Sequence, residues 1–381
     1  MASEHSLPKT MKALVLDSFS QPPEIKTVPT PEPTIGSAIV RIISANVLSY
    51  SGDVYSGKRQ YPYPTPFTPG VSAVVRITAL GPDATKLNVG DLAFLDPLVR
   101  SRDAPEEAYL AGLHQGMSKG SAKLAADVYR DWTYAEYARV PLEVLTAFNE
   151  KRLTGSPAEG GLGYAIDQLA YISALGVPYG GLRDIDLKVG ETIIVAPATG
   201  PFGGAAVLMC LAMGARVIAF GRNTAALEAV KQRVPYPDRV ATVPITGDMM
   251  HDLAELKKAA AGPIDAFFDI GPPEASKSTH LKSAILALRH GGRVSLMGGY
   301  KDDIPLPHNK IMHWNIRIFG KWMYERSDVT DLVRLIESGI LKLGKDGGVE
   351  VVGTFPLEEW NAAFDMAAEQ NTMGRFVLIK P

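Results

Sequence analysis

The chain has 381 residues, more than one hydrophobic core usually organises, so we expect two domains. Apolar residues make up 46% of it and charged residues 21%, which excludes a disordered protein. The 39 Lys and Arg nearly balance the 41 Asp and Glu, so the net charge of −2 provides no drive toward nucleic acid or an anionic membrane. A small-molecule substrate is the expected partner.

The single cysteine, Cys210, lies in an apolar segment, so this chain can form neither an intrachain disulfide nor a thiolate metal cluster. The N-terminal run MASEHSLPKT lacks the apolar core of an export signal. No charge-free run of about 18 apolar residues occurs, so a membrane-spanning helix is not expected either. These features predict a cytoplasmic protein.

Residues 1–164 are predicted to form a β-rich domain. Clusters of Pro and Gly separate short β-type segments there, among them KALVLDSF, AIVRIISANV and AVVRITALG. An insert at about residues 96–131 is long and charged and contains glycine. These properties favour a cap or one wall of a substrate pocket over a bare linker.

Residues 165–325 show a different pattern, in which apolar strands alternate with helical stretches. The six expected strands are ETIIVA, RVIAF, RVATV, IDAFFDI, RVSLMGG and NIRIFG. Strands joined by helical crossovers predict a doubly wound parallel sheet, which places the chain in the α/β class. Residues 326–381 return to a mixed pattern and are expected to rejoin the first domain.

The stretch VAPATGPFGG, residues 195–204, ends the first of these strands and opens the following helix. Ala198, Gly200 and Gly203 have the spacing of a dinucleotide-binding fingerprint whose first glycine is replaced by alanine. Gly200 would let the backbone approach a pyrophosphate, and Gly203 would let the helix pack on the strand. The alternative is a strand-to-helix turn that binds nothing.

The end of the second strand predicts which coenzyme is used. An NAD site places an Asp or Glu about 20 residues beyond the glycine turn, but this chain has FGRN there. Gly221 leaves room for a 2′-phosphate, and the Arg222 guanidinium can bind it in a bidentate way. We therefore expect NADP as the cofactor; the alternative is that Arg222 simply points to solvent.

Five further segments, taken together, indicate which family of proteins the chain resembles: MKALVLDSF, PTPFTPGVSAVV, VGDLAF, YAEYARVP and the closing GRFVLIKP. In these, and in the turn above, the chain resembles the medium-chain dehydrogenase/reductase superfamily over nearly its whole length. The resemblance implies a GroES-like catalytic domain, a Rossmann cofactor domain and an active site in the cleft between them.

Zinc-dependent members of that superfamily carry a Cys, a His-Glu pair and a third ligand Cys where this chain has Leu48, Val71 with Ser72, and Ala174. Leu, Val and Ala cannot ligate zinc. The four-Cys structural zinc lobe is missing as well. The chain therefore resembles the zinc-independent branch, which includes quinone oxidoreductases and enoyl reductases, and we expect no metal.

The resemblance also places the ends of later strands, at Gly298 and Gly299, beside the cofactor. The residues expected to bind the cofactor are Thr199, Gly200, Pro201, Phe202, Gly203, Gly204, Gly221, Arg222, Asn223, Ile270, Gly298 and Gly299.

The expected catalytic residues are Tyr50 and, as a second choice, Ser49. By the resemblance, Tyr50 falls where zinc-dependent members use a hydroxyl residue in a proton relay. A phenol can donate a hydrogen bond to a carbonyl oxygen and pass on a proton. The alternative is that Tyr50 is a packed aromatic residue and that water supplies the proton.

The segment GMSKG, residues 116–120, matches the G-x-S-x-G pattern of a hydrolase nucleophile. No strand is expected before it, so a hydrolase is disfavoured. We expect instead a zinc-independent, NADPH-dependent reductase of an activated alkene, a quinone or a carbonyl compound, assembled as a homodimer. The alternatives are an alcohol or ketone oxidoreductase and a cofactor-binding protein with a non-redox role or no catalytic role.

Overall fold

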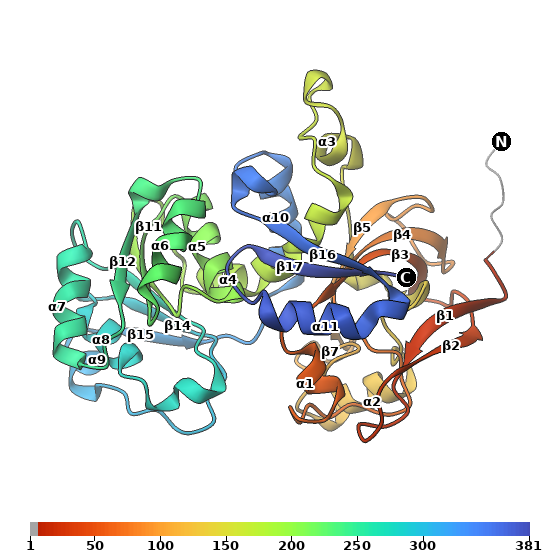
Figure 1. Ribbon diagram of the computed structural model, residues 1–381, viewed down its shortest axis with the longest axis horizontal. Helices are drawn as coiled ribbons and strands as arrows, with labels where there is room; N and C mark the ends of the chain where they lie inside the picture. Colours follow the sequence, from red (N-terminus) through yellow and green to blue (C-terminus); the bar gives the residue numbers. More distant parts are fainter. Residues whose placement is uncertain (1–6) are drawn as a thin grey trace. The chain divides into compact units, whose positions relative to one another are not determined.

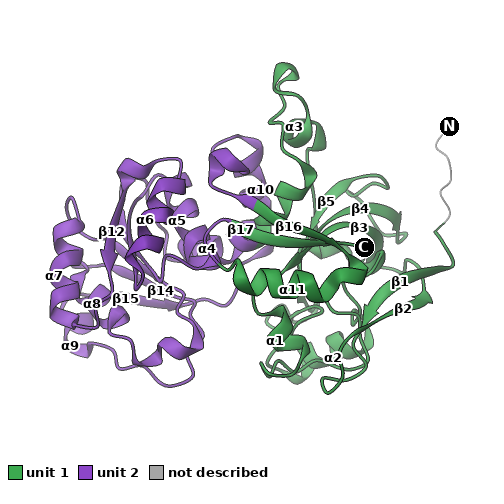
Figure 2. Cartoon of the chain, viewed as in Figure 1, with its two compact units in different colours: residues 1–173, 351–371, 375–381 green, residues 174–350, 372–374 purple. Residues whose placement is uncertain are grey.

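The computed structural model describes residues 7–381, which form two compact units (Figure 1, Figure 2). Unit 1 comprises residues 7–173, 351–371 and 375–381, and unit 2 comprises residues 174–350 and 372–374. The last part of the chain is therefore divided between the units, with a stretch of three residues belonging to unit 2.

Unit 1 is built on a seven-stranded sheet centred on β3 (Ser37–Val47). β3 pairs antiparallel with β4 (Ala73–Leu80), and most of its side chains are buried, as the apolar run AIVRIISANV predicts. The other strands of this sheet are β5 (Leu92–Leu95), β8 (Tyr137–Pro141), β9 (Leu145–Ala147), β16 (Glu350–Pro356) and β17 (Arg375–Lys380). A separate antiparallel hairpin is formed by β1 (Thr10–Val15) and β2 (Glu24–Pro29).

Aromatic side chains fill much of the core of unit 1. The Tyr55 ring lies 5.7 Å from the Phe364 ring and 6.2 Å from the Tyr134 ring, centroid to centroid. The first contact joins two helices, because Tyr55 ends one helix of this unit and Phe364 belongs to the helix that packs along β17 (Figure 1). The helices of this unit are α1 (Ser51–Tyr55), α2 (Lys119–Asp127), α3 (Glu150–Thr154) and α11 (Trp360–Glu369).

The insert at residues 96–131 is folded into unit 1. It contains a short hairpin, β6 (Leu98–Arg100) with β7 (Ala108–Leu110), followed by α2. Tyr109 is fully buried, and its hydroxyl donates a hydrogen bond to the Tyr129 carbonyl at 3.1 Å. The insert thus contributes side chains to the hydrophobic core of this unit.

Unit 2 contains the six-stranded, all-parallel sheet that the alternating pattern predicts. Its spatial order is β12-β11-β10-β13-β14-β15, so the order reverses between β10 and β13, as in a doubly wound fold. The strands are β10 (Thr192–Ala196), β11 (Arg216–Gly221), β12 (Val240–Pro244), β13 (Ala266–Asp269), β14 (Arg293–Leu296) and β15 (Arg317–Gly320).

Helices connect these strands. The first crossover helix, α5 (Pro201–Ala212), is apolar on all sides and buried along most of its length, as its composition of small and aliphatic residues predicts. The other helices are α4 (Ile172–Asp184), α6 (Thr224–Arg233), α7 (Met249–Ala259), α8 (His280–Ala287), α9 (His308–His313) and α10 (Arg326–Glu337).

The chain returns to unit 1 later than residue 326, the position expected from the sequence, because α10 belongs to unit 2. Arg183 on α4 lies 2.7 Å from the Asp331 carboxylate and 3.6 Å from that of Asp328. A Cβ atom on Gly180 would lie 2.7 Å from the Tyr324 Cβ, so α4 and the start of α10 are closely packed. The first boundary likewise falls after Ser173 rather than after residue 164.

Within residues 7–381, no helix is both long and apolar enough to cross a membrane. The longest in this part of the chain, α4, has 13 residues, whereas a bilayer requires about 20.

Candidate functional site

The turn between β10 and α5 packs tightly against the end of the strand. A Cβ atom on Gly203 would lie 1.8 Å from the Pro197 carbonyl oxygen, which no side chain can tolerate. The Ala198 amide donates a hydrogen bond to the Phe220 carbonyl at 3.0 Å and so ties the turn to β11. Gly203 therefore has the packing role expected of it, and Ala198 fits in place of a glycine because the turn has no positive φ there.

A second contact ties this turn to residues 372–374. A Cβ atom on Gly204 would lie 2.3 Å from the Met373 Cβ. The Met373 amide donates a hydrogen bond to the Thr199 carbonyl at 3.3 Å. The sequence offers no local signal for this contact, because the partners are far apart along the chain.

The space beside Gly200 is open. No heavy atom lies within 4 Å of the position that its Cβ would occupy. Gly200 is the N-cap of α5, no side chain caps this helix end, and Pro201 follows in the first turn. The amides of Phe202 and Gly203 belong to that first turn and have no acceptor within the helix. Amides of this kind, next to open space, fit a phosphate group.

The end of β11 carries no acidic side chain. Gly221 is its last residue, and a Cβ atom there would lie 3.4 Å from the Thr199 side chain and 3.3 Å from that of Leu227. Arg222 follows with an exposed side chain. Asn223 caps α6, because its side-chain oxygen accepts a hydrogen bond from the Ala226 amide at 3.0 Å. This capping role alone is enough to explain why an asparagine occupies position 223, whether or not a ligand binds there.

The remaining predicted cofactor residues follow β13 and β14. The Ile270 amide donates to the Ala196 carbonyl at 2.9 Å, and the Gly299 amide donates to the Gly271 carbonyl at 3.1 Å. Gly299 is exposed, with open space beside it. All strands of this sheet are parallel, so the residues that follow β10, β11, β13 and β14 meet at the same edge. The structure thus brings the twelve predicted cofactor residues together at the carboxyl edge of one sheet, where doubly wound folds bind ligands.

The predicted catalytic residues lie in unit 1, between β3 and α1. Ser49 and Tyr50 are both half-buried. The Arg59 guanidinium lies over the Tyr50 ring, 4.1 Å from its centroid, and also 4.7 Å from the centroid of the Tyr61 ring. Arg59 donates a hydrogen bond to the Tyr61 hydroxyl at 2.6 Å. No signal in the sequence marks Arg59 and Tyr61 as neighbours of Tyr50.

The surroundings of Tyr50 keep its phenol protonated. Burial raises the pKa of Tyr50 above its ordinary value, Tyr61 adds to this effect and the Arg59 charge opposes it. The His114 ring lies 5.0 Å from the Tyr61 ring, and burial lowers the pKa of His114. The cluster therefore combines a phenol that can donate a proton, a guanidinium and a histidine that burial holds toward its neutral form.

The positions where the resemblance to zinc-dependent dehydrogenases implies metal ligands contain side chains of a different kind. Val71 and Ser72 are buried, and the Ser72 hydroxyl accepts a hydrogen bond from the Asn46 side chain at 3.1 Å. Leu48 packs against the core of unit 1, and Ala174 lies on α4 in unit 2. Over residues 7–381, no group of three or more His, Cys, Asp or Glu side chains is placed to hold a metal ion.

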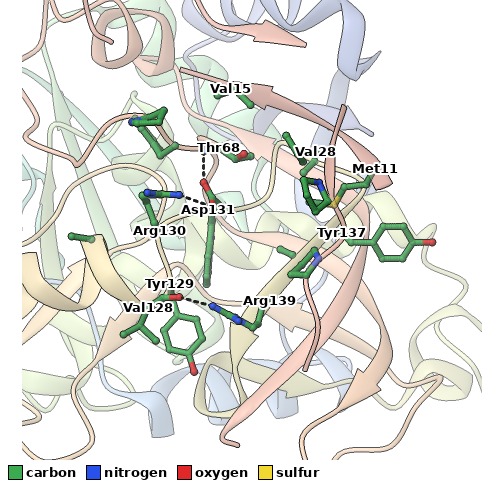
Figure 3. A pocket seen from close by; sticks show the side chains of 18 of the residues that line it. Met11, Val15, Val28, Thr68, Val128, Tyr129, Arg130, Asp131, Tyr137 and Arg139 are labelled. Atoms are coloured by element: carbon green, nitrogen blue, oxygen red, sulfur yellow. Dashed lines mark hydrogen bonds and ion pairs between the residues drawn. The ribbon is translucent and has the colours of Figure 1, made fainter. Parts of the chain in front are cut away.

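A pocket of about 520 Å³ lies in unit 1 and is partly lined by the end of the insert (Figure 3). The Asp131 side chain in this lining accepts a hydrogen bond from the Thr68 amide at 2.8 Å, and Arg139 donates to the Val128 carbonyl at 3.3 Å. None of the predicted site residues lines this pocket. The insert does form a pocket wall, but the pocket is not the site that the sequence predicts.

Ser118, the central residue of the GMSKG segment, has a structural role. It is the N-cap of α2, and its hydroxyl accepts a hydrogen bond from the Ser121 amide at 3.0 Å. The Ser121 hydroxyl in turn accepts one from the Ser118 amide at 3.2 Å, which completes a capping box. This capping role explains the serine without a nucleophile.

The chain is similar in sequence to known dehydrogenases and reductases. The family model described as "Zinc-binding dehydrogenase" matches residues 201–338, which run from α5 to the end of α10. The chain is 25% identical to an alcohol dehydrogenase of Geobacillus stearothermophilus, over 97% of this chain and 99% of that protein. It is 28% identical to an acryloyl-coenzyme A reductase of Metallosphaera sedula, over 97% and 99% of the two chains.

These matches support the medium-chain dehydrogenase/reductase superfamily. A solved structure of an alcohol dehydrogenase from E. coli CFT073, complexed with NADH, is similar with a TM-score of 0.75 and 17% identity, over 98% of this chain and 100% of that one. The two-domain fold class, with a GroES-like domain and a Rossmann domain, is confirmed. The relatives also support an oxidoreductase of this superfamily. The matched range of the family model excludes Leu48, Val71, Ser72 and Ala174.

Replacing Gly203 with alanine should destabilise the fold, because the new methyl group would displace α5 from the end of β10. Overpacking of this kind costs about 1–3 kcal/mol, so we expect Gly203→Ala to lower Tm by several degrees. The control is Gly262→Ala, since no heavy atom lies within 4 Å of a Cβ at Gly262. Equal Tm values for the two variants would contradict the contact at Pro197.

Proposed function

We propose that the protein is a zinc-independent, NADPH-dependent reductase of activated alkenes, quinones or carbonyl compounds. The observation that carries the proposal is the carboxyl edge of the parallel sheet. An open glycine turn at the start of α5 and the acid-free end of β11 lie there together. This edge offers amides for a pyrophosphate and a guanidinium for one further phosphate.

The coenzyme assignment depends on residues 221–223. A carboxylate at this place would bind the ribose hydroxyls of NADH and repel a 2′-phosphate. Here Gly221 and the exposed Arg222 occupy it instead. Arg222 can approach a 2′-phosphate without first breaking an ion pair, since no ion pair is assigned to it in the described part of the chain.

The chain's own groups must orient the substrate and supply a proton. NADPH would supply the hydride. Tyr50 keeps its proton and can donate it to the oxygen or carbon that becomes basic during reduction. The Arg59 charge over the Tyr50 ring favours the phenolate that this donation leaves behind, because an adjacent cation stabilises an anion.

The proposal needs no metal for the polarisation of the substrate. Leu48 and Val71 have no ligating atom, and the Ser72 hydroxyl is hydrogen-bonded to Asn46. Hydrogen bonding from a protonated phenol can polarise a carbonyl group instead. A zinc-dependent mechanism would require ligands at these positions.

A second candidate is the interconversion of alcohols and ketones. It is favoured by the similarity to the Geobacillus alcohol dehydrogenase, whereas similarity to the acryloyl-coenzyme A reductase favours alkene reduction. Both reactions use the same coenzyme edge. They differ in where the hydride arrives and in which atom receives the proton.

The proposal is tested by supplying the purified protein with NADPH and separate sets of enones, quinones and ketones. We expect NADPH oxidation with the activated alkenes or quinones, a saturated or hydroquinone product, and unchanged rates after treatment with a strong chelator. Turnover of ketones alone, together with oxidation of the matching alcohols by NADP⁺, would favour the second candidate. Loss of activity on chelation, restored by zinc, together with about one zinc per chain, would overturn the metal-free mechanism.

The Arg222→Ala variant tests the coenzyme assignment. Removing the guanidinium deletes a charge-assisted contact to the 2′-phosphate, so we expect NADPH affinity to fall about tenfold or more while NADH affinity stays the same. Titration calorimetry with both coenzymes measures this. Arg216→Ala is the matched control, because Arg216 is an exposed arginine at the opposite end of β11. Unchanged NADPH affinity in Arg222→Ala would reject the assignment.

The Tyr50→Phe variant tests the proton donor. It keeps the ring under Arg59 but removes the hydroxyl, so we expect kcat to fall about 10²-fold with little change in coenzyme affinity. Because the pKa of Tyr50 is raised, the donor stays protonated as the pH rises, and wild-type kcat should show no alkaline loss below about pH 10. Tyr137→Phe, a change in a half-buried tyrosine of β8, is the control. Wild-type turnover in Tyr50→Phe would leave Ser49 or water as the donor.

A further inference from the structure

Three polar side chains meet beneath the carboxyl edge of the parallel sheet in unit 2. Asp269 is the last residue of β13, His280 is the first residue of α8, and Tyr300 follows β14. The Tyr300 hydroxyl donates a hydrogen bond to Asp269 Oδ1 at 2.7 Å. His280 Nε2 lies 3.1 Å from the same oxygen and 3.2 Å from the Tyr300 hydroxyl. Neither the fingerprint nor the resemblance to the superfamily pointed to this cluster.

The cluster is buried and tightly bonded. Asp269 is 0% exposed and His280 is 2% exposed, so the carboxylate depends on these two donors. Its other oxygen, Oδ2, is buried without a hydrogen-bond partner in the described part of the chain. His280 Nδ1 lies 2.7 Å from the Ser278 hydroxyl, which orients the ring. Removing one donor would therefore leave a poorly compensated buried charge.

The same cluster joins two loops, residues 270–273 and residues 297–301. The Met297 amide donates to the Asp269 carbonyl at 2.9 Å, and the Gly299 amide donates to the Gly271 carbonyl at 3.1 Å. The Tyr300 side chain crosses from one loop to the other. Its hydroxyl lies so close to Gly271 that a Cβ atom there would be 2.2 Å from it.

Gly298 shows how closely the loops approach one another. A Cβ atom on Gly298 would lie 2.7 Å from the Gly271 nitrogen and 2.8 Å from Asp269 Oδ2. The Asp269 carboxylate thus lies next to the point where the two loops approach one another most closely. Any shift of Asp269 would be passed directly to Gly271 and Gly298.

The position of these loops connects the cluster to the coenzyme. The strand order reverses between β10 and β13, and doubly wound folds bind the two halves of a dinucleotide on either side of that reversal. The Gly200 turn and Arg222 lie on the side of β10 and β11 and would hold the adenosine half. The loops after β13 and β14 lie on the other side and would face the nicotinamide half.

We propose that the Asp269–His280–Tyr300 cluster is a positioning device for the nicotinamide half of the coenzyme. It fixes the paired loops on which the nicotinamide riboside rests and contributes nothing to adenosine binding. This inference rests on the proposed use of NADPH. The three side chains touch neither half themselves; they act through the backbone of residues 270–273 and 297–301.

The test compares two ligands in the Tyr300→Phe variant. One is NADPH, and the other is 2′-phospho-ADP-ribose, which has the adenosine half and the pyrophosphate but no nicotinamide. Tyr300→Phe keeps the ring and removes the bond to Asp269. We expect NADPH to bind about tenfold more weakly and 2′-phospho-ADP-ribose to bind within about twofold of wild type, since misplaced contacts are lost only on the nicotinamide side. Titration calorimetry measures both affinities.

Tyr236→Phe, a change in an exposed tyrosine of unit 2, is the control and should alter neither affinity. His280→Gln repeats the comparison with the second donor and decides the question if Tyr300→Phe does not fold. Equal weakening of both ligands, or no weakening of either, would overturn the positioning role. If wild type binds neither ligand, the proposed function itself fails, which is a separate and recognisable outcome.

Discussion

The contact between Gly203 and the Pro197 carbonyl oxygen sets the geometry on which the rest of unit 2 depends. The first turn of α5 lies against the residue that follows β10, and no side chain fits between them at Gly203. Helix α5 is apolar throughout and is buried beside the sheet, so its start cannot shift without disturbing the core. The same turn is therefore closely packed at Gly203 and open at Gly200.

The two candidate sites use charge in different ways. Around Tyr50, the Arg59 cation lies over aromatic rings, so it can respond to a negative charge that develops nearby. Beneath the carboxyl edge of unit 2, the Asp269 charge is buried and committed to Tyr300 and His280. The first arrangement suits a group that exchanges a proton. The second suits a group that holds its surroundings in place.

Much of the fold could be predicted from the sequence because its signals are local. Bounded apolar runs mark the strands of the parallel sheet, and the glycine spacing of residues 195–204 marks the turn after β10. The Asp269–His280–Tyr300 cluster could not be predicted, because its members come from three elements and follow no spacing rule. The same is true of Arg59 over Tyr50, and of the Arg183 ion pairs that join α4 and α10. Such contacts depend on which elements the completed fold brings together.

The division of residues 351–381 between the units has a consequence for biosynthesis. Met373 packs on Gly204 in unit 2, while Val377 on β17 pairs with Val47 on β3 in unit 1. Each unit thus closes its core with residues that leave the ribosome long after its central strand. Until then the parts of β3 and α5 that these residues cover stay exposed in the nascent chain, a situation in which partly folded proteins aggregate or engage chaperones. Neither unit can therefore reach its final packing until these late residues have been synthesised.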